Sequence, residues 1–263
     1  MKPLSILGLL YCSIMLGTHY IITKQISTHI DVSMLTAYRF MIAAVPLYVC
    51  LIYIKKNPFQ NIKPGLILGF FLWLVFILIS IGLKYTTAIN TGFISGIFFV
   101  FVPIVNYLFF KKYLKLSHLP VMMISVLGLY FLTGGLNHLG LGDLLILFSA
   151  VFTSIHLVLV GYYSKQDLDP ITLCFQQFLV VSILSLIYAL TTGKLSLLVP
   201  AAQLTPLLFL GLLPTLSVFF IQMVSLKSVS EITAAILLSL QPGFAAFFGY
   251  WLGGESFTKI QFV

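Results

Sequence analysis

Residues 31–40, DVSMLTAYRF, open an apolar segment long enough to cross a membrane, and residues 169–178, DPITLCFQQF, open another one 138 positions later. Three residues recur at this spacing: Asp31, Leu35 and Phe40 return as Asp169, Leu173 and Phe178. A first half with an odd number of membrane spans forces its copy to enter the bilayer upside down. The duplication therefore predicts two inverted halves, an arrangement typical of secondary transporters, because such halves can exchange inward- and outward-facing shapes.

Two further matches extend the duplication along each half. Pro103 recurs as Pro242 with an offset of 139, and residues 83–87, LKYTT, have an echo in residues 226–230, LKSVS, if a four-residue gap is allowed before the proline. The glycine-rich residues 134–142 separate the two halves and are expected outside the cell. We therefore predict two repeats, residues 1–134 and 142–263.

The composition indicates a protein whose solvent is lipid. Charged residues make up 8% and apolar residues 60% of the 263 positions, whereas a soluble domain carries about 25% charged residues. Apolar stretches of about twenty residues are typical of membrane-spanning helices. Nine such stretches occur, at residues 4–23, 33–54, 64–83, 88–110, 119–133, 142–162, 170–190, 204–224 and 232–252. The predicted fold class is therefore all-α, a polytopic membrane protein built from two inverted five-helix repeats.

The repeat also predicts a span that the sequence does not complete. The counterpart of residues 119–133 is expected at about residues 258–272, but the chain ends at Val263. We interpret residues 258–263 as the first turn of a tenth span. The expected architecture is a ten-span fold, here with nine spans plus the start of a truncated tenth.

The charge distribution predicts orientation. The formal net charge is +8, but the lysines are scattered over the loops and form no continuous basic face, so we predict no nucleic-acid partner. Nine lysines fall on the N-terminal side of the membrane: Lys2, Lys55, Lys56, Lys63, Lys111, Lys112, Lys115, Lys165 and Lys227. Four fall on the opposite side: Lys24, Lys84, Lys194 and Lys259. The positive-inside rule then makes the N-terminus cytoplasmic, and we expect an integral protein of a bacterial-type plasma (inner) membrane.

Neither a nucleotide motif nor a cofactor motif is visible. No Gly-x-x-x-x-Gly-Lys-Ser/Thr sequence occurs, which argues against ATP as the direct energy source. Cys12, Cys50 and Cys174 all fall inside spans, where a free cysteine is usually a small apolar packing residue. We therefore predict no cofactor and no metal site. The expected partners are a small-molecule substrate and the lipid bilayer, and the sequence does not predict an oligomeric state.

Five short motifs occur together along the chain. They are Gly17-Thr18 in the first span, Arg39-Phe40 in the second, residues 84–88 (KYTTA) leading into Phe93-Ile94 and Pro103 in the fourth, residues 234–242 (AAILLSLQP) in the ninth, and Gly254-Glu255 at its end. This set resembles the EamA-type branch of the drug/metabolite transporter superfamily, over the whole chain. Three features depart from the family pattern: Leu16 replaces a common tryptophan, Lys111-Lys112 replaces a frequent acidic residue, and the tenth span is missing.

The resemblance implies export or import of small metabolites. We predict a secondary active transporter that exports organic compounds such as amino acids or related molecules, although the family members differ widely in substrate. An intramembrane enzyme and a facilitative, channel-like permease are the alternatives. The enzyme is disfavoured because His29, His118 and His138 are scattered over loops and the acidic residues do not cluster.

Ionisable residues inside spans are candidate functional residues, because charge in hydrocarbon is costly. Arg39 could bind a substrate carboxylate or phosphate in a two-pronged fashion, or could be a structural arginine that bonds backbone carbonyls or reaches outward. His19 and His156 lie in the first span of each repeat and could carry protons or bond substrate. Gln177, at the repeat position of Arg39, and its neighbour Gln176 are further candidates. For the histidines and glutamines, ordinary interhelical hydrogen bonding is the alternative.

Transporter sites of this design lie near the bilayer midplane where the repeats meet. The polar or aromatic residues near the middle of their spans are Trp73, Ser95, Phe99, Thr153, Thr215, Ser239 and Gln241. We predict that these residues line the substrate pathway, with Trp73 and Phe99 forming an aromatic pocket. For each of them packing is the alternative.

Interior prolines predict the moving parts, because each removes a helical hydrogen bond and favours a kink. We predict hinges at Pro103, Pro214, Pro242 and Gly243, with the sharpest break at residues 241–243. The acidic residues all fall in loops or at span ends: Asp31, Asp143, Asp167, Asp169, Glu231 and Glu255. A carboxylate proton relay is therefore not expected, which leaves the histidines or facilitated diffusion.

Overall fold

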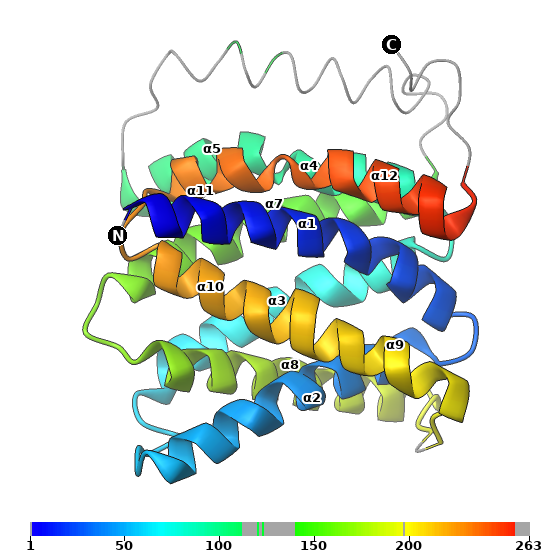
Figure 1. Ribbon diagram of the computed structural model, residues 1–263, viewed down its shortest axis with the longest axis horizontal. Helices are drawn as coiled ribbons and strands as arrows, with labels where there is room; N and C mark the ends of the chain where they lie inside the picture. The colour runs from blue at the N-terminus through cyan, green and yellow to red at the C-terminus, as the bar shows by residue number, and fades with distance from the viewer. Residues whose placement is uncertain (1, 112–119, 121–122, 124–139, 197, 256–263) are drawn as a thin grey trace.

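The computed structural model describes residues 2–111, 120, 123, 140–196 and 198–255, and the secondary structure assigned there is helical, without strands. The helices run nearly along the longest axis of the molecule (Figure 1). In chain order they are α1 (Lys2–Ile26), α2 (Val32–Tyr53), α3 (Ile62–Gly82), α4 (Ala88–Gly96), α5 (Phe98–Phe110), α7 (Leu141–Ser164), α8 (Pro170–Thr191), α9 (Ala201–Gly211), η3 (Leu212–Ser217), α10 (Val218–Ser225), α11 (Glu231–Leu238) and α12 (Gln241–Gly253).

Eight segments of the described chain are long and apolar enough to cross a membrane. They are Pro3–Ile26, Val32–Tyr53, Ile62–Gly82, Ala88–Phe110, Leu141–Ser164, Pro170–Thr191, Ala201–Ser225 and Glu231–Gly253. Each corresponds to a predicted span, with ends that differ by a few residues. The predicted fifth span, residues 119–133, lies outside the described residues apart from positions 120 and 123, and the start of the tenth, residues 258–263, lies wholly outside them.

Two of these spans are interrupted. The segment Ala88–Phe110 breaks at Ile97, between α4 and α5, and the segment Glu231–Gly253 breaks at a turn formed by Ser239 and Leu240, between α11 and α12. The sequence predicts the second break at residues 241–243, two residues too late. Proline fits the first turn of a helix, where no N–H is needed, so Pro242 lies in the first turn of α12 and not in the gap.

A third span widens instead of breaking. Between α9 and α10 the chain forms the π-helical segment η3, which contains Pro214. Proline has no N–H to give to the helical ladder, and a π-helical turn is a common way to accommodate such a gap. The predicted irregularity at Pro214 is therefore present, whereas Pro103 lies inside α5, six residues beyond the break at Ile97.

The matching sequence fragments build the same helix starts. Asp31 caps α2 by accepting from the Ser33 N–H at 3.0 Å, and Asp169 caps α8 by accepting from the Thr172 N–H at 2.9 Å. A side chain in this position satisfies one of the four N–H groups that a helix leaves unbonded at its start.

The second pair of fragments does the same for the two interrupted spans. Thr87 caps α4 by accepting from the Asn90 N–H at 3.0 Å, and Ser230 caps α11 by accepting from the Thr233 N–H at 3.1 Å. The echo between residues 83–87 and 226–230 is thus an echo of helix starts.

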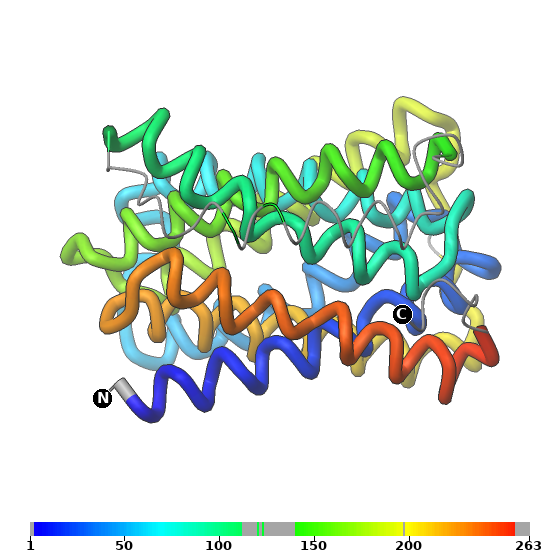
Figure 2. The backbone as a smooth tube through the Cα atoms, turned by 90° about the horizontal axis from the view of Figure 1, so that it is seen from above, coloured from blue at the N-terminus to red at the C-terminus, as the bar shows by residue number. Residues whose placement is uncertain are grey.

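Small residues let α12 approach both α1 and α4 closely. A Cβ atom added to Gly92 would collide with Ala245, and one added to Gly96 would collide with Pro242. A Cβ atom at Gly17 would collide with the side chain of Phe244 and lie 2.9 Å from a backbone nitrogen of α12. In both Figure 1 and Figure 2, α1 runs beside the α11–α12 segment. Small residues at such crossings are typical of membrane helices.

The close crossing of α1 and α12 predicts a strong effect of side-chain volume at Gly17. Gly17→Leu should lower the midpoint of thermal unfolding, because overpacking a tight contact typically costs about 1–3 kcal/mol. Gly243→Ala is the matched control, since nothing lies within 4 Å of a Cβ atom there. Differential scanning fluorimetry of the detergent-solubilised full chain measures both, and equal midpoints for the two variants would contradict the predicted crossing.

Candidate functional site

A cavity lies in the middle of the helix assembly, between α1, α3, α4, α5, α7 and the α10–α12 region. Its apolar wall includes Leu72, Val75, Phe76 and Ile79, which share one face of α3 because they are three or four residues apart. Its polar lining residues are His19, Tyr20, Ser95, Thr153, His156, Gln222 and Gln241. Five predicted pathway residues are therefore brought together here: His19, Ser95, Thr153, His156 and Gln241.

The cavity is small. It leaves about 50 Å³ for the centres of water-sized spheres, whereas one water needs about 10–15 Å³ by this measure. The space suits a few waters, and an organic metabolite would need the walls to move apart. Ser95, Phe98, Leu238 and Gln241 lie next to the two helix breaks, so part of the wall comes from the interrupted spans.

Three polar residues at the cavity form a closed hydrogen-bond network. The Gln241 amide donates to the Tyr20 hydroxyl and to Ser95 Oγ, the latter at 3.2 Å. Tyr20 Oη and Ser95 Oγ are 2.6 Å apart, and Ser95 Oγ donates to the Gly92 carbonyl at 3.1 Å. The network ties α1, α4 and α12 together at the point where α12 begins.

The two histidines have different surroundings. His156 Nε2 lies 3.0 Å from Gln177 Oε1, so the residue at the repeat position of Arg39 orients a cavity histidine. His19 Nδ1 lies 2.8 Å from the Leu16 carbonyl, while its buried Nε2 has no hydrogen-bond partner among the described residues. His19 is 2% exposed, which makes this nitrogen a polar atom without a partner in an apolar interior.

Arg39 lies behind the cavity wall. Its Nε donates to Thr215 Oγ1 and its Nη2 lies 3.5 Å from the Pro214 carbonyl, both in η3. The guanidinium carbon lies 4.5 Å from the ring centre of Phe76, which lines the cavity. Arg39 is 2% exposed and has no carboxylate partner among the described residues. The structure therefore places Arg39 and Thr215 at the π-helical segment.

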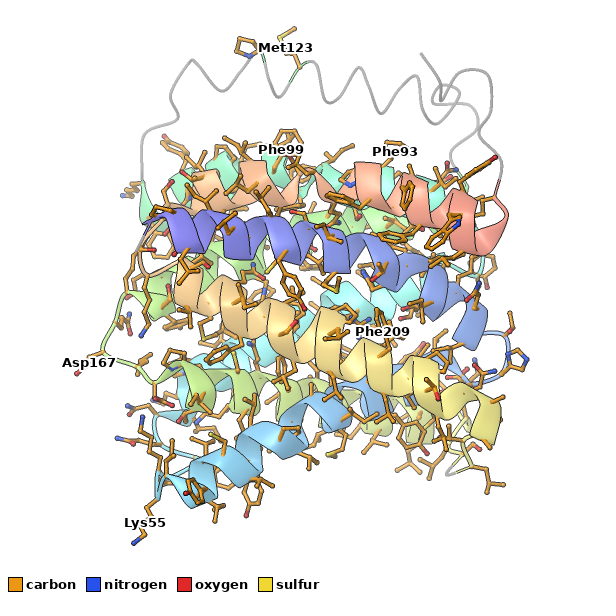
Figure 3. The ribbon with its side chains drawn as sticks, in the orientation of Figure 1. Lys55, Phe93, Phe99, Met123, Asp167 and Phe209 are labelled. Carbon is orange, nitrogen blue, oxygen red and sulfur yellow. The ribbon has the colours of Figure 1, made fainter. Side chains whose placement is uncertain are left out.

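Several predicted pathway residues lie elsewhere. Trp73 is half-buried on α3, beside Phe70 and Tyr188, and Phe99 is half-buried among core residues near the edge of the helix assembly (Figure 3). Ser239 donates to the Ile236 carbonyl of its own helix. Gln176 donates to the carbonyls of Pro58 and Gln60 in the loop between α2 and α3. None of these four residues lines the cavity.

The sequence analysis missed Tyr20, Phe76, Phe219 and Gln222 as cavity residues. A signal for Phe76 was available, because the cavity face of α3 repeats at helical spacing through residues 72, 75, 76 and 79. For Tyr20 the signal was its position beside His19, one helical turn after the close-packed Gly17. No sequence signal separates Gln222 from other polar residues in spans.

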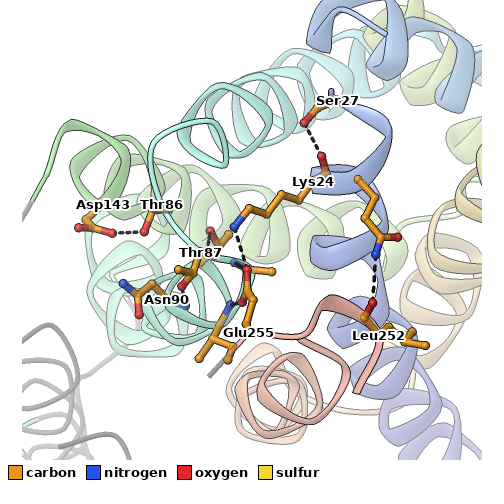
Figure 4. Close-up of polar contacts among 12 residues, drawn as sticks. Lys24, Ser27, Thr86, Thr87, Asn90, Asp143, Leu252 and Glu255 are labelled. Carbon is orange, nitrogen blue, oxygen red and sulfur yellow. Dashed lines mark hydrogen bonds and ion pairs between the residues drawn. The ribbon is translucent and has the colours of Figure 1, made fainter. Parts of the chain in front are cut away.

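An ion pair and two backbone hydrogen bonds join three helices at one end of the helix assembly, which we call the Glu255 end (Figure 4). Glu255 pairs with Lys24 at 2.8 Å, and its two carboxylate oxygens accept from the backbone N–H groups of Ala88 and Ile89 at 2.9 Å. A carboxylate at a helix start is favoured by the unbonded N–H groups and the helix dipole. Glu255 thereby joins α1, the start of α4 and the end of α12.

Other ion pairs gather at the opposite end, which we call the Glu231 end. Lys165 pairs with Glu231 at 2.6 Å, and Lys56 pairs with Asp169. Lys55 and Asp167 are labelled at this end in Figure 3. Glu231 stands in the first turn of α11 and touches Gly161 of α7. Each end of the molecule thus has a carboxylate at the start of an interrupted span, paired with a lysine.

The capping aspartates have lowered pKa values. Partial burial raises the pKa of Asp169, but hydrogen bonds from Lys56 and Thr172 and the Lys56 charge outweigh burial and lower it. Asp31 behaves likewise through Ser33 and its neighbouring lysines, and its pKa is lowered despite burial. Both groups therefore favour the ionised form in the folded protein.

Comparison with known proteins gives the family. The sequence model of the EamA-like transporter family matches two stretches of the chain, residues 3–134 and 140–263. The chain belongs to this family. The comparison confirms the resemblance predicted from the sequence motifs. The EamA-like chain is thus an integral membrane protein of a transporter family, whose members handle small molecules in a lipid bilayer.

A sequence relative and a solved structure are similar to this EamA-like protein, the first in sequence and the second in fold. An uncharacterized transporter of Archaeoglobus fulgidus is 29% identical over 262 residues, covering 97% of this chain and 80% of the relative. A solved crystal structure of another protein superposes with a TM-score of 0.77 over 99% of this chain and 92% of its own, at 14% identity. At that identity the likeness concerns the fold alone.

The lowered pKa of Asp169 predicts that folding depends on pH. A depressed pKa stabilises the fold above the unfolded value near 3.9, and this contribution is lost as the pH falls through the lower folded value. Asp169→Asn should therefore lower the thermal midpoint at pH 7, and the difference from the unmodified protein should shrink as the pH falls below the unfolded value. Thermal unfolding of both proteins across this pH range measures the difference, and a constant difference at all pH values would contradict it.

Proposed function

We propose that the protein is a secondary transporter that moves a small organic metabolite by alternating access between two inverted halves, residues 1–134 and 142–263. Two observations support the halves: the family model matches twice, and the paired sequence fragments cap corresponding helices. The interrupted spans, α4–α5 and α11–α12, also occupy corresponding places in the two halves.

The single observation that carries the proposal is the central cavity. Both halves contribute to it, through α1, α3, α4 and α5 on one side and α7, α10, α11 and α12 on the other. It contains polar groups midway between two ends that are closed by ion pairs. A site that must be reached from each side in turn requires this arrangement.

Each end of the helix assembly has a lysine–carboxylate ion pair, which could form and break as a gate to the cavity. Lys24 lies in the last turn of α1 and pairs with Glu255 at the start of α4, while Lys165 follows α7 and pairs with Glu231 in the first turn of α11. At each end, the lysine at the end of a half's first span thus meets a carboxylate that lies at the start of that half's interrupted span. Glu231 comes from the same half as its lysine, and Glu255 comes from the other half. We propose that one gate opens while the other stays closed.

The proposed orientation rests on charge. The lysine-rich Glu231 end is assigned to the cytoplasm by the positive-inside rule, which places the N-terminus there in a bacterial-type plasma membrane. The direction proposed is export, and the substrate class is organic metabolites such as amino acids. None of the described cavity-lining residues is a carboxylate, so proton coupling through an acidic relay is not part of the proposal.

The gate proposal predicts opposite effects of two substitutions. Glu255→Gln should raise labelling of a cavity thiol from the Glu255 side only, and Glu231→Gln from the Glu231 side only, because each removes the charge of one gate. The reporter is Thr153→Cys in a background without Cys12, Cys50 and Cys174, labelled with an impermeant maleimide in oriented proteoliposomes. Lys194→Gln is the control, since Lys194 pairs with Asp31 at an exposed position.

The outcomes of this labelling separate the candidate functions. Labelling that rises from both sides in one variant would indicate a continuous pore and a channel-like permease. Labelling that stays at the control level in both variants would remove the ion pairs from the gating mechanism.

Arg39 provides a second test. We expect Arg39→Gln to fold normally but to lose saturable flux, because the amide can still reach the η3 oxygens while the buried charge beside the cavity is gone. Thermal unfolding and uptake or release of a metabolite mixture by proteoliposomes measure the two properties. Loss of folding would instead make Arg39 a purely structural residue. Conversion of a supplied compound into a new product would indicate an enzyme.

A further inference from the structure

The cavity has a chemical bias that the proposed function does not specify. A carbonyl oxygen can only accept, so the 2.8 Å contact with Leu16 places a proton on His19 Nδ1. The neutral ring then carries its lone pair on Nε2. That atom is buried, belongs to a cavity-lining residue, and has no partner among the described residues. Burying such an atom without a partner is unfavourable until something donates to it.

His156 offers a second acceptor by the same reasoning. The Gln177 amide nitrogen lies 3.7 Å from Cys174 Sγ, which directs the amide oxygen toward His156 Nε2. Nε2 therefore donates, and the neutral ring keeps its lone pair on Nδ1. The two histidines come from corresponding spans, α1 and α7, so each half contributes one acceptor.

Most donor hydrogens at the cavity are already used inside the protein. The Gln241 amide hydrogens go to Tyr20 and Ser95, and the Ser95 hydroxyl goes to a backbone carbonyl. The Thr153 hydroxyl donates to the Ser149 carbonyl at 2.8 Å. Gln222 is the described lining residue whose amide keeps free donor capacity. The cavity thus offers mainly acceptors.

The positive charge of Arg39 further limits which molecules the cavity can bind. The guanidinium of Arg39 lies against the ring of Phe76, whose side chain lines the cavity, and no carboxylate among the described residues neutralises it. In a medium of low dielectric constant such a charge acts over several ångströms and repels a cation.

We propose that His19 Nε2 accepts a hydrogen bond from the transported molecule, so that the cavity selects compounds with an apolar body, an N–H or O–H donor, and no net positive charge. This inference rests on the proposed function, since it assigns the substrate of that same cavity. The apolar wall from α3 contacts the apolar body of the molecule, and His19 Nε2 accepts the hydrogen bond from its N–H or O–H group.

The test uses paired compounds in which N-methylation removes the hydrogen-bond donors and adds methyl groups, so the His19 variants described below separate the loss of donors from the added size. L-leucine, L-phenylalanine and benzamide are compared with their N,N,N-trimethyl or N,N-dimethyl analogues, each at millimolar concentration. The readout is the thermal midpoint of the purified full chain in detergent, because a ligand that binds only the folded state raises it. We expect donor-bearing compounds to raise the midpoint and their methylated analogues not to.

Variants then assign the effect to one atom. His19→Phe keeps an aromatic ring but removes the acceptor, and should weaken binding of the donor-bearing compounds about tenfold. His19→Gln restores an acceptor and should recover part of the binding. His29→Phe is the matched control, because His29 lies at the exposed end of α1 and contacts Thr28.

Three results would overturn the inference. They are equal shifts with the methylated analogues, an undiminished preference in His19→Phe, and no shift with any donor-bearing compound. Flux in proteoliposomes separates this inference from the function on which it rests. Donor-selective binding without flux would contradict transport alone, and flux without donor selectivity would contradict the role of His19 alone.

Discussion

Hydrocarbon gives the peptide backbone nothing to bond with, so every N–H and C=O of a span must find its partner inside the protein. This constraint explains where the helices of this protein depart from regular geometry. The breaks at Ile97 and at Ser239–Leu240 adjoin the cavity, and η3 is met by the side chain of Arg39. Irregular backbone occurs where polar groups are available to compensate for it, and the polar centre of the molecule is built around these places.

The sequence predicts the local features well, because they depend on neighbouring residues. Asp31 and Asp169 mark helix starts, and eight of the nine predicted spans fall within the described chain as helices. His19 and His156 were candidates because an ionisable residue inside an apolar span stands out in the sequence. The face of the helix that points toward the cavity is harder to predict from the sequence. Trp73 and Phe76 lie within one turn of each other, yet only Phe76 faces the cavity.

Contacts between distant segments were not predictable, since they depend on how the spans pack. Arg39 meets Thr215, 176 residues later, and Glu255 bonds the backbone of Ala88, 167 residues earlier. The residues around Arg39 and Glu255 give no indication of which distant residue each one contacts. The same is true of Gln177, whose amide orients His156 across a helix pair. These long-range contacts fix which candidate residues can cooperate, so the membership of the site required the fold.

The position of Glu255 has a consequence for biogenesis. Its carboxylate bonds the first N–H groups of α4, but these residues are synthesised 167 and 166 positions earlier. During translation the N–H groups at the start of α4 and the Lys24 ammonium at the end of α1 therefore gain this carboxylate partner only when the last segment of the described chain has been made. A ribosome that stalls before residue 255 would leave the N–H groups of Ala88 and Ile89 with only water or lipid headgroups as partners.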